Sequence, residues 1–454
     1  MTAATQPALD PAGLRARAGE IVARDRWSRE RLLELQQTRL RALLAHAVER
    51  SPYYREAFGA DAAEARLDEL PTLPKPLLME QFDRVVTDPA LRLADLEAFL
   101  ADARPGAAFR GEYRVFGTSG STGIPGLFVY SHEEFAHWIA VGLAAFARAG
   151  VTPETRLIAI GAPSDLHITR QLFAAFQAGR EGVPRLSVTT PLPETVAALN
   201  AYRPDALLAY ASVVGTLADE QLDGRLAIEP DLIVTTSEVL TDETERRIEA
   251  AWSRRPVNAY AATEAPGIAI GSRDHVGMHV FEDSLVLEVV DDDCQPVSPG
   301  EPGSRVLLTN LINRAQPLIR YELSDAVVLE DGPDPSGRPY LRVARVDGRS
   351  SDFLRFPSNG GGEIAIHPYR LRAPFSAMLE IRQYQIVRVP EGLLVRVVAR
   401  ASASRDLPDR VRRAIAGGLE EAGAAPTTIQ VELVDELERE AGHAAKLKLV
   451  ASAT

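Results

Sequence analysis

The sequence predicts an α/β protein with two domains. The larger, N-terminal domain holds mainly parallel sheets with helices plus a β-rich subdomain, and the smaller, C-terminal domain is α+β. Three observations support this fold class. The chain has 454 residues, too many for one ordinary hydrophobic core. Apolar runs alternate with helical patterns in its middle, and its last hundred residues show a separate pattern. We place the domains at 1–348 and 349–454.

The first predicted element is an amphipathic helix over Trp27–Arg50, where apolar residues recur at helical spacing. Strands and helices then alternate, which requires crossover connections and therefore a parallel sheet. The predicted strands are Arg156–Ile160, Ala206–Tyr210, Leu232–Thr235 and Val257–Tyr260. The predicted helices are His132–Ala149, Ile168–Ala178, Leu192–Ala201, Val213–Leu222 and Glu243–Trp252.

Short β-rich runs separated by Pro and Gly turns follow over His279–Val346. In the last hundred residues, QIVRV and LLVRVVA predict a hairpin across PEG. A helix over Leu407–Ala422 and a strand at TIQVELV complete a small α+β unit.

Composition excludes several classes of function. Hydrophobic residues make up 46% and charged residues 25%, a balance typical of a globular protein, and the net charge is −13. An acidic surface repels nucleic acid and anionic lipid, so neither is an expected partner. The single cysteine, Cys294, can build no disulfide framework or cysteine-rich zinc site. Met1–Gly13 lacks a signal-peptide pattern, and no apolar run approaches a membrane span, so we expect a cytoplasmic protein.

Lysine is rare. Only three of the 50 basic residues are lysines, and two of them, Lys446 and Lys448, lie in the segment AAKLKLV near the C-terminus. A GC-rich codon bias explains the arginine excess. A position that keeps lysine under such a bias indicates a need for a compact point charge.

The segment Gly117–Pro125, GTSGSTGIP, is the most informative motif. It follows YRVF and precedes LFVYS, so it is expected to join two strands. Small residues let backbone N–H groups point inward, and the hydroxyl groups add donors, which suits a polyphosphate. It is neither a Walker loop nor a dinucleotide fingerprint. From composition alone, a flexible Gly/Ser turn is favoured over a phosphate site.

The amino-acid sequence of that loop resembles the signature loop of the adenylate-forming enzymes. This superfamily includes acyl-CoA synthetases, luciferases and peptide-synthetase adenylation domains. NAYAATE (258–264) resembles the superfamily's aromatic–Gly–x–Thr–Glu motif. The N-terminal helix and three further segments resemble the phenylacetate–CoA ligase branch. These segments are GMHVFED (277–283), PLIRYELSD (317–325) and RVDGRSSDFL (345–354). The resemblance covers nearly the whole chain, with its motifs in the expected order.

The resemblance implies an ATP site. Tyr260 would lie against the adenine face, and Asp325 would accept hydrogen bonds from the ribose hydroxyls. Arg349 would contact the ribose or phosphate side. Glu264 would coordinate Mg²⁺, a cation that prefers oxygen ligands. The remaining nucleotide contacts would be Thr118, Ser119, Gly120, Ser121, Thr122, Gly123, Ser237, Glu238 and Thr263. Without the resemblance, Tyr260 would be read as a core tyrosine, Glu264 and Asp325 as turn residues, and Arg349 as part of a surface salt bridge.

Lys446 aligns with the lysine that the family uses for adenylation, and Lys448 is the alternative. An ammonium group between a carboxylate and the α-phosphate of ATP offsets their repulsion in the transition state. In the family the C-terminal domain rotates between two half-reactions, which implies a mobile domain here with its hinge at Ser350–Ser351.

The sequence departs from the family pattern at four places. Ala261 replaces the glycine after the motif tyrosine, and Ser351 replaces an acidic hinge residue. The loop RFPSNGGGEIAIHPYRL replaces an Arg-Gly-x-Asn stretch that helps to shape the thiol channel, and AAKLKLV lacks a preceding glycine. The sequence therefore supports the first half-reaction, formation of the acyl-adenylate, more strongly than the second, transfer of the acyl group to a thiol.

We expect activation of a small carboxylic acid, aromatic or apolar, to an acyl-adenylate, then transfer to the thiol of CoA or a carrier protein. A non-thiol acceptor and a nucleotide-binding homologue without turnover are the alternatives. The acid pocket is expected around Trp138, His167–Phe176 and Tyr210–Val214. The sequence does not decide between a monomer and a homodimer.

Overall fold

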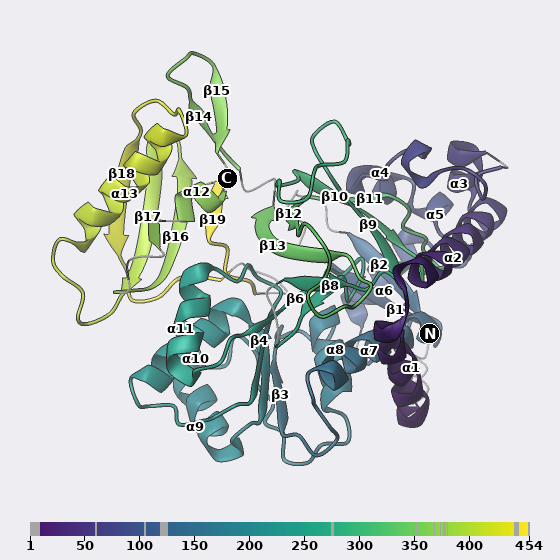
Figure 1. The fold of residues 1–454 in the computed structure, drawn as a ribbon, viewed down its shortest axis with the longest axis horizontal. Helices are drawn as coiled ribbons and strands as arrows, with labels where there is room; N and C mark the ends of the chain where they lie inside the picture. Colours follow the sequence, from purple (N-terminus) through teal and green to yellow (C-terminus); the bar gives the residue numbers. More distant parts are fainter. Residues whose placement is uncertain are drawn as a thin grey trace.

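The computed structural model describes residues 10–59, 61–103, 106–118, 126–273, 277–349, 353–366, 368–372, 374–375, 378, 380–439 and 445–452. They form a large N-terminal domain and a smaller C-terminal domain, drawn at the upper left of Figure 1 in yellow-green. The buried apolar residues divide in the same way, because one set of clusters lies between Leu14 and Val343 and another between Leu354 and Val450.

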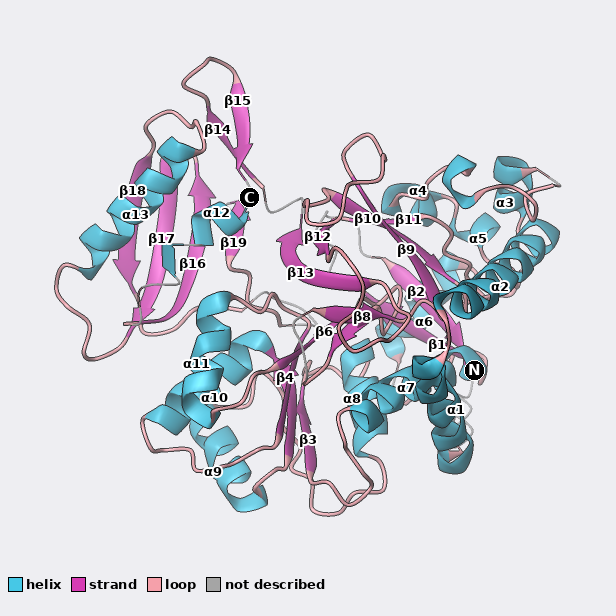
Figure 2. Ribbon diagram, in the orientation of Figure 1, coloured by secondary structure: helices cyan, strands magenta, loops and turns pink. Residues whose placement is uncertain are grey.

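Figure 2 shows the distribution of helices and strands. The helices are α1 (Pro11–Ala23), η1 (Arg24–Arg26), α2 (Arg29–Arg50), α3 (Pro52–Phe58), η2 (Leu67–Glu69), α4 (Lys75–Glu80), α5 (Phe82–Val85), α6 (Leu93–Asp102), α7 (His132–Arg148), α8 (Ile168–Gln177), α9 (Leu192–Tyr202), α10 (Ala211–Leu222), α11 (Asp242–Trp252), α12 (Pro368–Arg372) and α13 (Leu407–Glu421). The strands are β1 (Tyr113–Gly117), β2 (Leu127–Ser131), β3 (Leu157–Ile160), β4 (Ala206–Tyr210), β5 (Leu232–Thr236), β6 (Val257–Tyr260), β7 (Ala269–Gly271), β8 (Met278–Val280), β9 (Leu285–Val290), β10 (Arg305–Asn310), β11 (Tyr321–Leu323), β12 (Asp325–Leu329), β13 (Arg342–Arg349), β14 (Leu354–Pro357), β15 (Glu363–Ile366), β16 (Ile381–Val389), β17 (Gly392–Ala399), β18 (Thr428–Leu433) and β19 (Val450–Ser452).

The largest sheet has the strand order β12-β13-β8-β7-β6-β5-β4-β3, in which β3 to β6 run parallel. Both faces of this parallel part are covered. Leu157 and Ala159 are buried in the cluster that contains α7, whereas Ile158 and Ile160 are buried with α10 and α11. Figure 1 shows these helix layers on opposite sides of the sheet. The parallel pairing confirms the predicted α/β fold. The strands could be predicted because a strand that is buried on both faces appears in the sequence as a continuous apolar run.

The N-terminal helix α2 begins two residues later than expected, at Arg29 rather than Trp27. Ser28 has an extended backbone, and its hydroxyl accepts a hydrogen bond from the Arg31 amide at 3.3 Å. This is an N-cap, which fixes the first helical residue.

The β-rich part of the N-terminal domain consists of the antiparallel sheet β11-β10-β9 and the hairpin β1-β2. The hairpin flanks the Gly/Ser loop, and Gly117 pairs with Leu127 at its open end. The prediction that this loop joins two strands is confirmed, although residues 119–125 of the loop lie outside the described residues.

The outer edge of β2 pairs with side chains rather than with another strand. Gln316 is fully buried; its Oε1 accepts from the Val129 amide at 2.9 Å, and its Nε2 donates to the Leu127 carbonyl at 3.0 Å. Asn313 Nδ2 donates to the Val129 carbonyl at 2.8 Å. The amide side chains therefore satisfy backbone groups that would otherwise be buried without a partner.

We expect Gln316→Leu to destabilise the N-terminal domain. The change leaves the Val129 amide and the Leu127 carbonyl unpaired, at about 1–3 kcal/mol for each group. Urea unfolding measures the loss as a lower midpoint. Gln295→Leu is the control, since Gln295 is exposed and its loss should stay within about 0.5 kcal/mol. Equal midpoints for the two variants would contradict this account.

The C-terminal domain is built on the sheet β18-β17-β16-β19, in which β16 and β17 form the predicted hairpin. Helix α13 buries Leu407, Val411, Ile415 and Leu419 against this sheet. The strand β18 runs parallel to β17, so α13 is the crossover between them. This part of the α+β prediction is confirmed.

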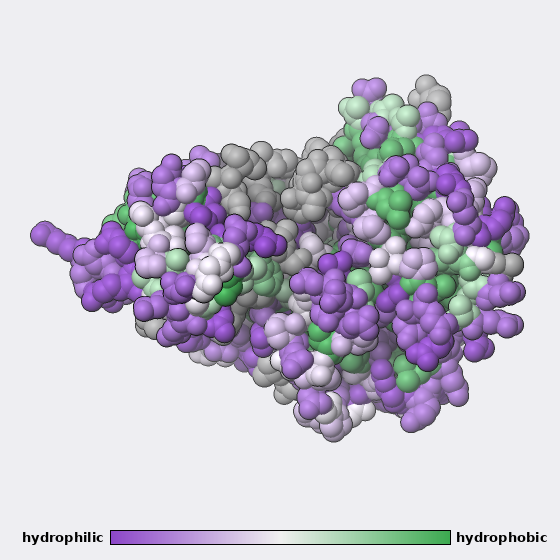
Figure 3. Space-filling view, turned by 90° about the horizontal axis from the view of Figure 1, so that it is seen from above, coloured by the Kyte–Doolittle hydropathy of each residue, from purple (hydrophilic) through white to green (hydrophobic). Residues whose placement is uncertain are grey.

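The boundary at 348/349 stays a prediction. Strand β13 continues to Arg349, which pairs in register with Asp325 of β12 in the large sheet. None of the described helices combines the length and the apolar character needed to cross a bilayer. Figure 3 shows hydrophilic side chains spread over both domains, with hydrophobic ones scattered between them.

Candidate active site

A cavity of 510 Å³ lies where the carboxyl ends of β4, β5 and β6 meet the C-terminal domain. In open α/β sheets, ligands bind at this edge. Nine residues that the sequence assigned to the nucleotide, the metal or catalysis line it: Thr118, Ser237, Glu238, Tyr260, Thr263, Glu264, Asp325, Arg349 and Lys446. The other assigned residues lie outside the described part of the chain, and they are Ser119, Gly120, Ser121, Thr122 and Gly123.

Glu264 lies in the turn after β6, and its side chain is buried in the cavity wall. The Asn310 side chain donates to the backbone carbonyl of Glu264 at 2.9 Å. The Tyr321 hydroxyl donates to the Glu264 carboxylate oxygen Oε1 at 3.2 Å. Burial raises the pKa of the Glu264 carboxyl, while the charges of Lys75 and Arg349 act in the opposite direction. A nearby cation would therefore stabilise the ionised form.

The charge of Glu264 suits a magnesium ion that is shared with a substrate. Within the described residues, no group of three or more histidine, cysteine, aspartate or glutamate side chains could hold a metal unaided. Mg²⁺ in nucleotide sites commonly takes one or two carboxylates, and waters and phosphates complete its shell. One buried carboxylate beside a space large enough for a nucleotide fits that pattern.

Lys75 is a site residue that the sequence analysis missed. It is the first residue of α4, and its Nζ donates to Thr118 Oγ1 at 3.0 Å, at the start of the Gly/Ser loop. Burial lowers the pKa of Lys75, and the carboxylate of Glu264 opposes this shift. All three lysines of the chain line the same cavity. The scarcity of lysine was therefore the signal that could have identified Lys75.

Tyr260, Asp325 and Arg349 form a connected group on three strands of the large sheet, β6 and the adjacent pair β12 and β13. The Tyr260 hydroxyl donates to Asp325 Oδ2 at 2.6 Å, and Arg349 Nε lies 3.7 Å from Asp325 Oδ1. Burial raises the pKa of the Tyr260 hydroxyl well above its usual value, and the Asp325 charge adds to this effect. Tyr260 is therefore a neutral donor that orients the Asp325 carboxylate.

Ser237 and Glu238 follow β5 at the edge of the cavity. Ser237 has a φ of +68°, an uncommon backbone conformation for a residue other than glycine. The Glu238 carboxylate accepts hydrogen bonds from the Leu447 amide at 2.7 Å and the Ser212 amide at 2.9 Å. Instead of facing open space, this side chain joins the two domains.

The structure brings Lys446 and Lys448 to the cavity together. Ala445 and Leu447, on either side of Lys446, are buried, and Ala445 has a left-handed φ of +48°. The geometry therefore places both lysines at the site, and the choice of Lys446 rests on the resemblance.

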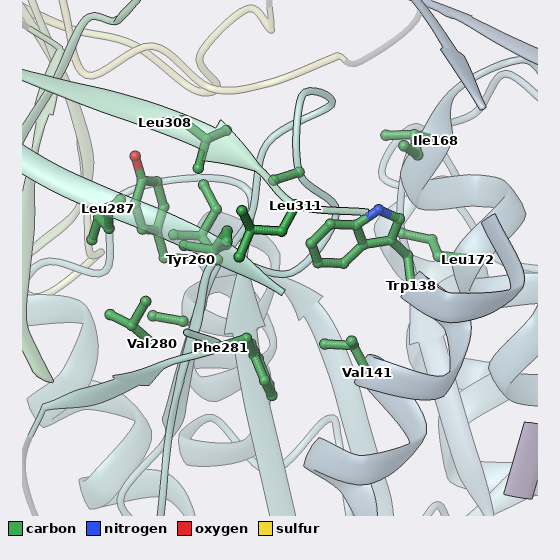
Figure 4. Close-up of a cluster of buried hydrophobic side chains, with 14 of the residues drawn as sticks. Trp138, Val141, Ile168, Leu172, Tyr260, Val280, Phe281, Leu287, Leu308 and Leu311 are labelled. Carbon is green, nitrogen blue, oxygen red and sulfur yellow. The ribbon is translucent and has the colours of Figure 1, made fainter. Parts of the chain in front are cut away.

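The expected acid pocket is only partly formed by the residues assigned to it. His167 and Ser212 line the cavity, and His167 caps α8. Trp138 instead packs in the apolar core, near Val141, Ile168 and Leu172 (Figure 4). The Trp138 side chain is buried because α7 lies between the sheet and the N-terminal helices. Helical periodicity predicts which residues of a helix are buried, but it does not distinguish a face that packs in the core from one that lines a cavity.

Comparison with known proteins finds related sequences and folds. The family described as AMP-binding enzyme matches residues 84–308. The phenylacetate–coenzyme A ligase of Thermus thermophilus is 27% identical over 376 residues, which are 81% of this chain and 80% of that protein. The phenylacetate–coenzyme A ligase of Escherichia coli is 28% identical over 335 residues, 72% of each chain. The crystal structure of a 2-hydroxyisobutyryl–CoA ligase in the postadenylation state, in complex with 2-HIB-AMP, aligns with a TM-score of 0.69 at 20% identity, covering 92% of this chain and 88% of that one.

The fold and the motifs define a class of enzyme: the chain belongs to the AMP-binding superfamily of adenylate-forming enzymes. Its relatives include phenylacetate–CoA ligases, which are 27–28% identical to it.

Proposed function

We propose that the protein activates a small carboxylic acid with ATP and Mg²⁺ and transfers the acyl group to the thiol of CoA. The observation that supports this most strongly is the meeting of Lys446, Glu264 and Asp325 in one cavity, although they lie in three separate parts of the sequence. Names of the relatives support CoA as the acceptor.

In the proposed first half-reaction, a carboxylate oxygen of the acid attacks the α-phosphorus of ATP. A bond forms to the acyl oxygen, and the bond to pyrophosphate breaks. Asp325 would hold the ribose hydroxyls, in an orientation set by Tyr260 and Arg349. Lys446 would lie between the acid and the α-phosphate, where its ammonium group offsets their repulsion. Bound at Glu264, Mg²⁺ would neutralise phosphate charge.

In the proposed second half-reaction, the CoA thiolate attacks the acyl carbonyl and AMP leaves. We propose that between the two steps the C-terminal domain rotates about Ser350–Ser351, which lie outside the described residues, while Arg349 stays paired with Asp325 in the large sheet. The contacts of the C-terminal domain with the N-terminal domain are polar, as expected for a reversible interface. Examples are the Tyr384 hydroxyl on Glu243 at 2.9 Å and the Gln383 amide on Thr216 at 3.0 Å.

The test is pyrophosphate release with ATP and Mg²⁺ across a panel of small aromatic and aliphatic acids, with and without CoA. Release that depends on one acid establishes adenylation, and AMP formation that requires CoA establishes the thioester step. If no acid supports release while ATP binds in calorimetry, the protein is a nucleotide-binding homologue and the proposal is wrong.

Adenylation with a non-thiol acceptor is the second candidate. It is favoured by the segment after the hinge, where β14 and β15 form a hairpin across a three-glycine turn in place of the family's Arg-Gly-x-Asn stretch. Acid-dependent pyrophosphate release that CoA does not accelerate would support this candidate.

We expect Lys75→Met to weaken ATP binding. A charged hydrogen-bond donor contributes about 1.5–3 kcal/mol, so the dissociation constant for ATP with Mg²⁺ should rise roughly 10- to 100-fold. Calorimetry measures it directly. Arg66→Met is the control, because it removes the same charge from an exposed side chain. Equal ATP affinities for the two variants would exclude Lys75 from the phosphate site.

A further inference from the structure

Glu238 contacts the segment that carries Lys446. The Glu238 side chain is 6% exposed, and its Oε1 accepts from the Leu447 amide and from Arg439 Nη1 at 3.3 Å. Its Oε2 accepts from the Ser212 amide. One carboxylate of the N-terminal domain thus holds the backbone of the residue next to Lys446.

Arg439 reinforces this connection from the other domain. Its Nη2 donates to Ser212 Oγ at 3.0 Å, and its Nη1 donates to the Ala445 carbonyl at 3.2 Å. The residues on either side of Lys446 are therefore both fixed, Ala445 through its carbonyl and Leu447 through its amide. Because the backbone is held on both sides of Lys446, the position of its Cα atom at the cavity is restricted.

These contacts depend on the orientation of the domains. A buried carboxylate is stable only when hydrogen-bond donors surround it, and two of its donors, Leu447 and Arg439, belong to the C-terminal segment. Hydrogen bonds from N–H groups to a carboxylate are also stronger than those between neutral groups. Ser237, the residue before Glu238, has a left-handed backbone conformation, which turns the chain after β5.

The remaining described contacts between the domains are of a different kind. Examples are Arg382–Asp223 and Tyr384–Glu243 at β16, Arg400–Asp219 just after β17, and the hydrogen bond from Arg372 Nη2 of α12 to the Asp347 carbonyl of β13. Such contacts orient the body of the C-terminal domain. The Glu238 contact instead acts on the segment that carries the lysine.

We propose that Glu238 is a positioning residue: it holds the Lys446 segment in the cavity for adenylation and releases it when the C-terminal domain turns. This inference rests on the proposed function. It gives Glu238 a role apart from the nucleotide contact that the resemblance implied.

Glu238→Gln tests this role. Glutamine replaces one carboxylate oxygen with an NH2 donor, so either the Ser212 amide or the Leu447 amide would face a donor instead of an acceptor. We expect kcat for acid-dependent ATP–pyrophosphate exchange to fall roughly 10- to 100-fold, because a displacement of about 1 Å can cost that much. KM for ATP should change by less than about threefold, since the nucleotide contacts stay intact. Transfer from a preformed acyl-adenylate should stay at the wild-type rate.

Arg439→Gln should show the same pattern, with a smaller loss, because the Leu447 amide keeps its acceptor. Glu220→Gln is the matched control. Glu220 is also a buried glutamate of the N-terminal domain with an arginine partner, Arg225, and that partner lies in its own domain. Exchange activity of Glu220→Gln should equal that of the wild type.

Hydrogen–deuterium exchange separates this inference from the proposed function, because it requires no turnover. In Glu238→Gln, peptides that cover 445–452 should exchange at least about tenfold faster than in the wild type and in Glu220→Gln. Unchanged protection of these peptides would overturn the inference, even if adenylation is confirmed. Faster exchange in a protein that activates no acid would uphold the contact while the proposed function fails. A raised KM for ATP with normal kcat would also overturn it, by returning Glu238 to the nucleotide.

Discussion

Lys446→Ala should lower acid-dependent ATP–pyrophosphate exchange by roughly 10²–10³-fold, the usual effect of removing one group that stabilises transition-state charge. The first half-reaction brings two anions together, and the ammonium of Lys446 is placed to offset their repulsion. Transfer from a preformed acyl-adenylate needs no such charge, so it should proceed at the wild-type rate. Single-turnover assays of the two half-reactions measure both quantities.

Lys448→Ala is the matched control, because it removes the same group from the same cavity. Its exchange activity should stay within about threefold of the wild type. If Lys446→Ala keeps full exchange while Lys448→Ala loses it, the catalytic lysine is Lys448. Loss of both half-reactions in Lys446→Ala would indicate a structural role instead.

Glu264→Gln should nearly abolish magnesium-dependent adenylation without destabilising the protein. Replacing a group that only supports a metal ligand costs about 10- to 100-fold, and a direct ligand should cost at least as much. The concentration of Mg²⁺ needed for half-maximal exchange should also rise. Glu322→Gln, which removes a carboxylate from the same cavity, should keep the wild-type magnesium dependence.

The stability of Glu264→Gln follows from the direction of the pKa shift. Burial raises the pKa of this carboxyl in the folded state, so its ionised form is less stable in the fold than in the unfolded chain. The wild type therefore loses stability as pH rises through the raised pKa. The neutral glutamine removes that cost and can still accept from Tyr321, so thermal unfolding near neutral pH should occur at the same temperature or higher. A large fall in unfolding temperature would contradict a metal-binding role and favour a structural one.

Much of the fold could be predicted because its signals are local. The strands β3 to β6 are short apolar runs between amphipathic helices, and both patterns are visible within a few residues. The described site residues could be assigned because their motifs are continuous in sequence, as in NAYAATE around Tyr260 and Glu264.

Lys75 could not be placed from the sequence because its position depends on distant contacts. Leu73 exchanges backbone hydrogen bonds with Arg320 and Glu322, on either side of Tyr321 in β11, which brings α4 to the Gly/Ser loop. No pattern within α4 indicates that pairing. The role of Glu238 could not be inferred for a related reason, since it depends on contacts between the two domains.

The side chains along the outer edge of β2 have a consequence for the behaviour of the protein at high concentration. A strand with unpaired backbone groups at a sheet edge is a template on which another chain can add. In β2, Gln316, Asn313 and the Glu134 capping carboxylate occupy the outward-facing groups of Leu127, Val129 and Ser131. We therefore expect these three polar side chains to prevent another chain from adding to this edge.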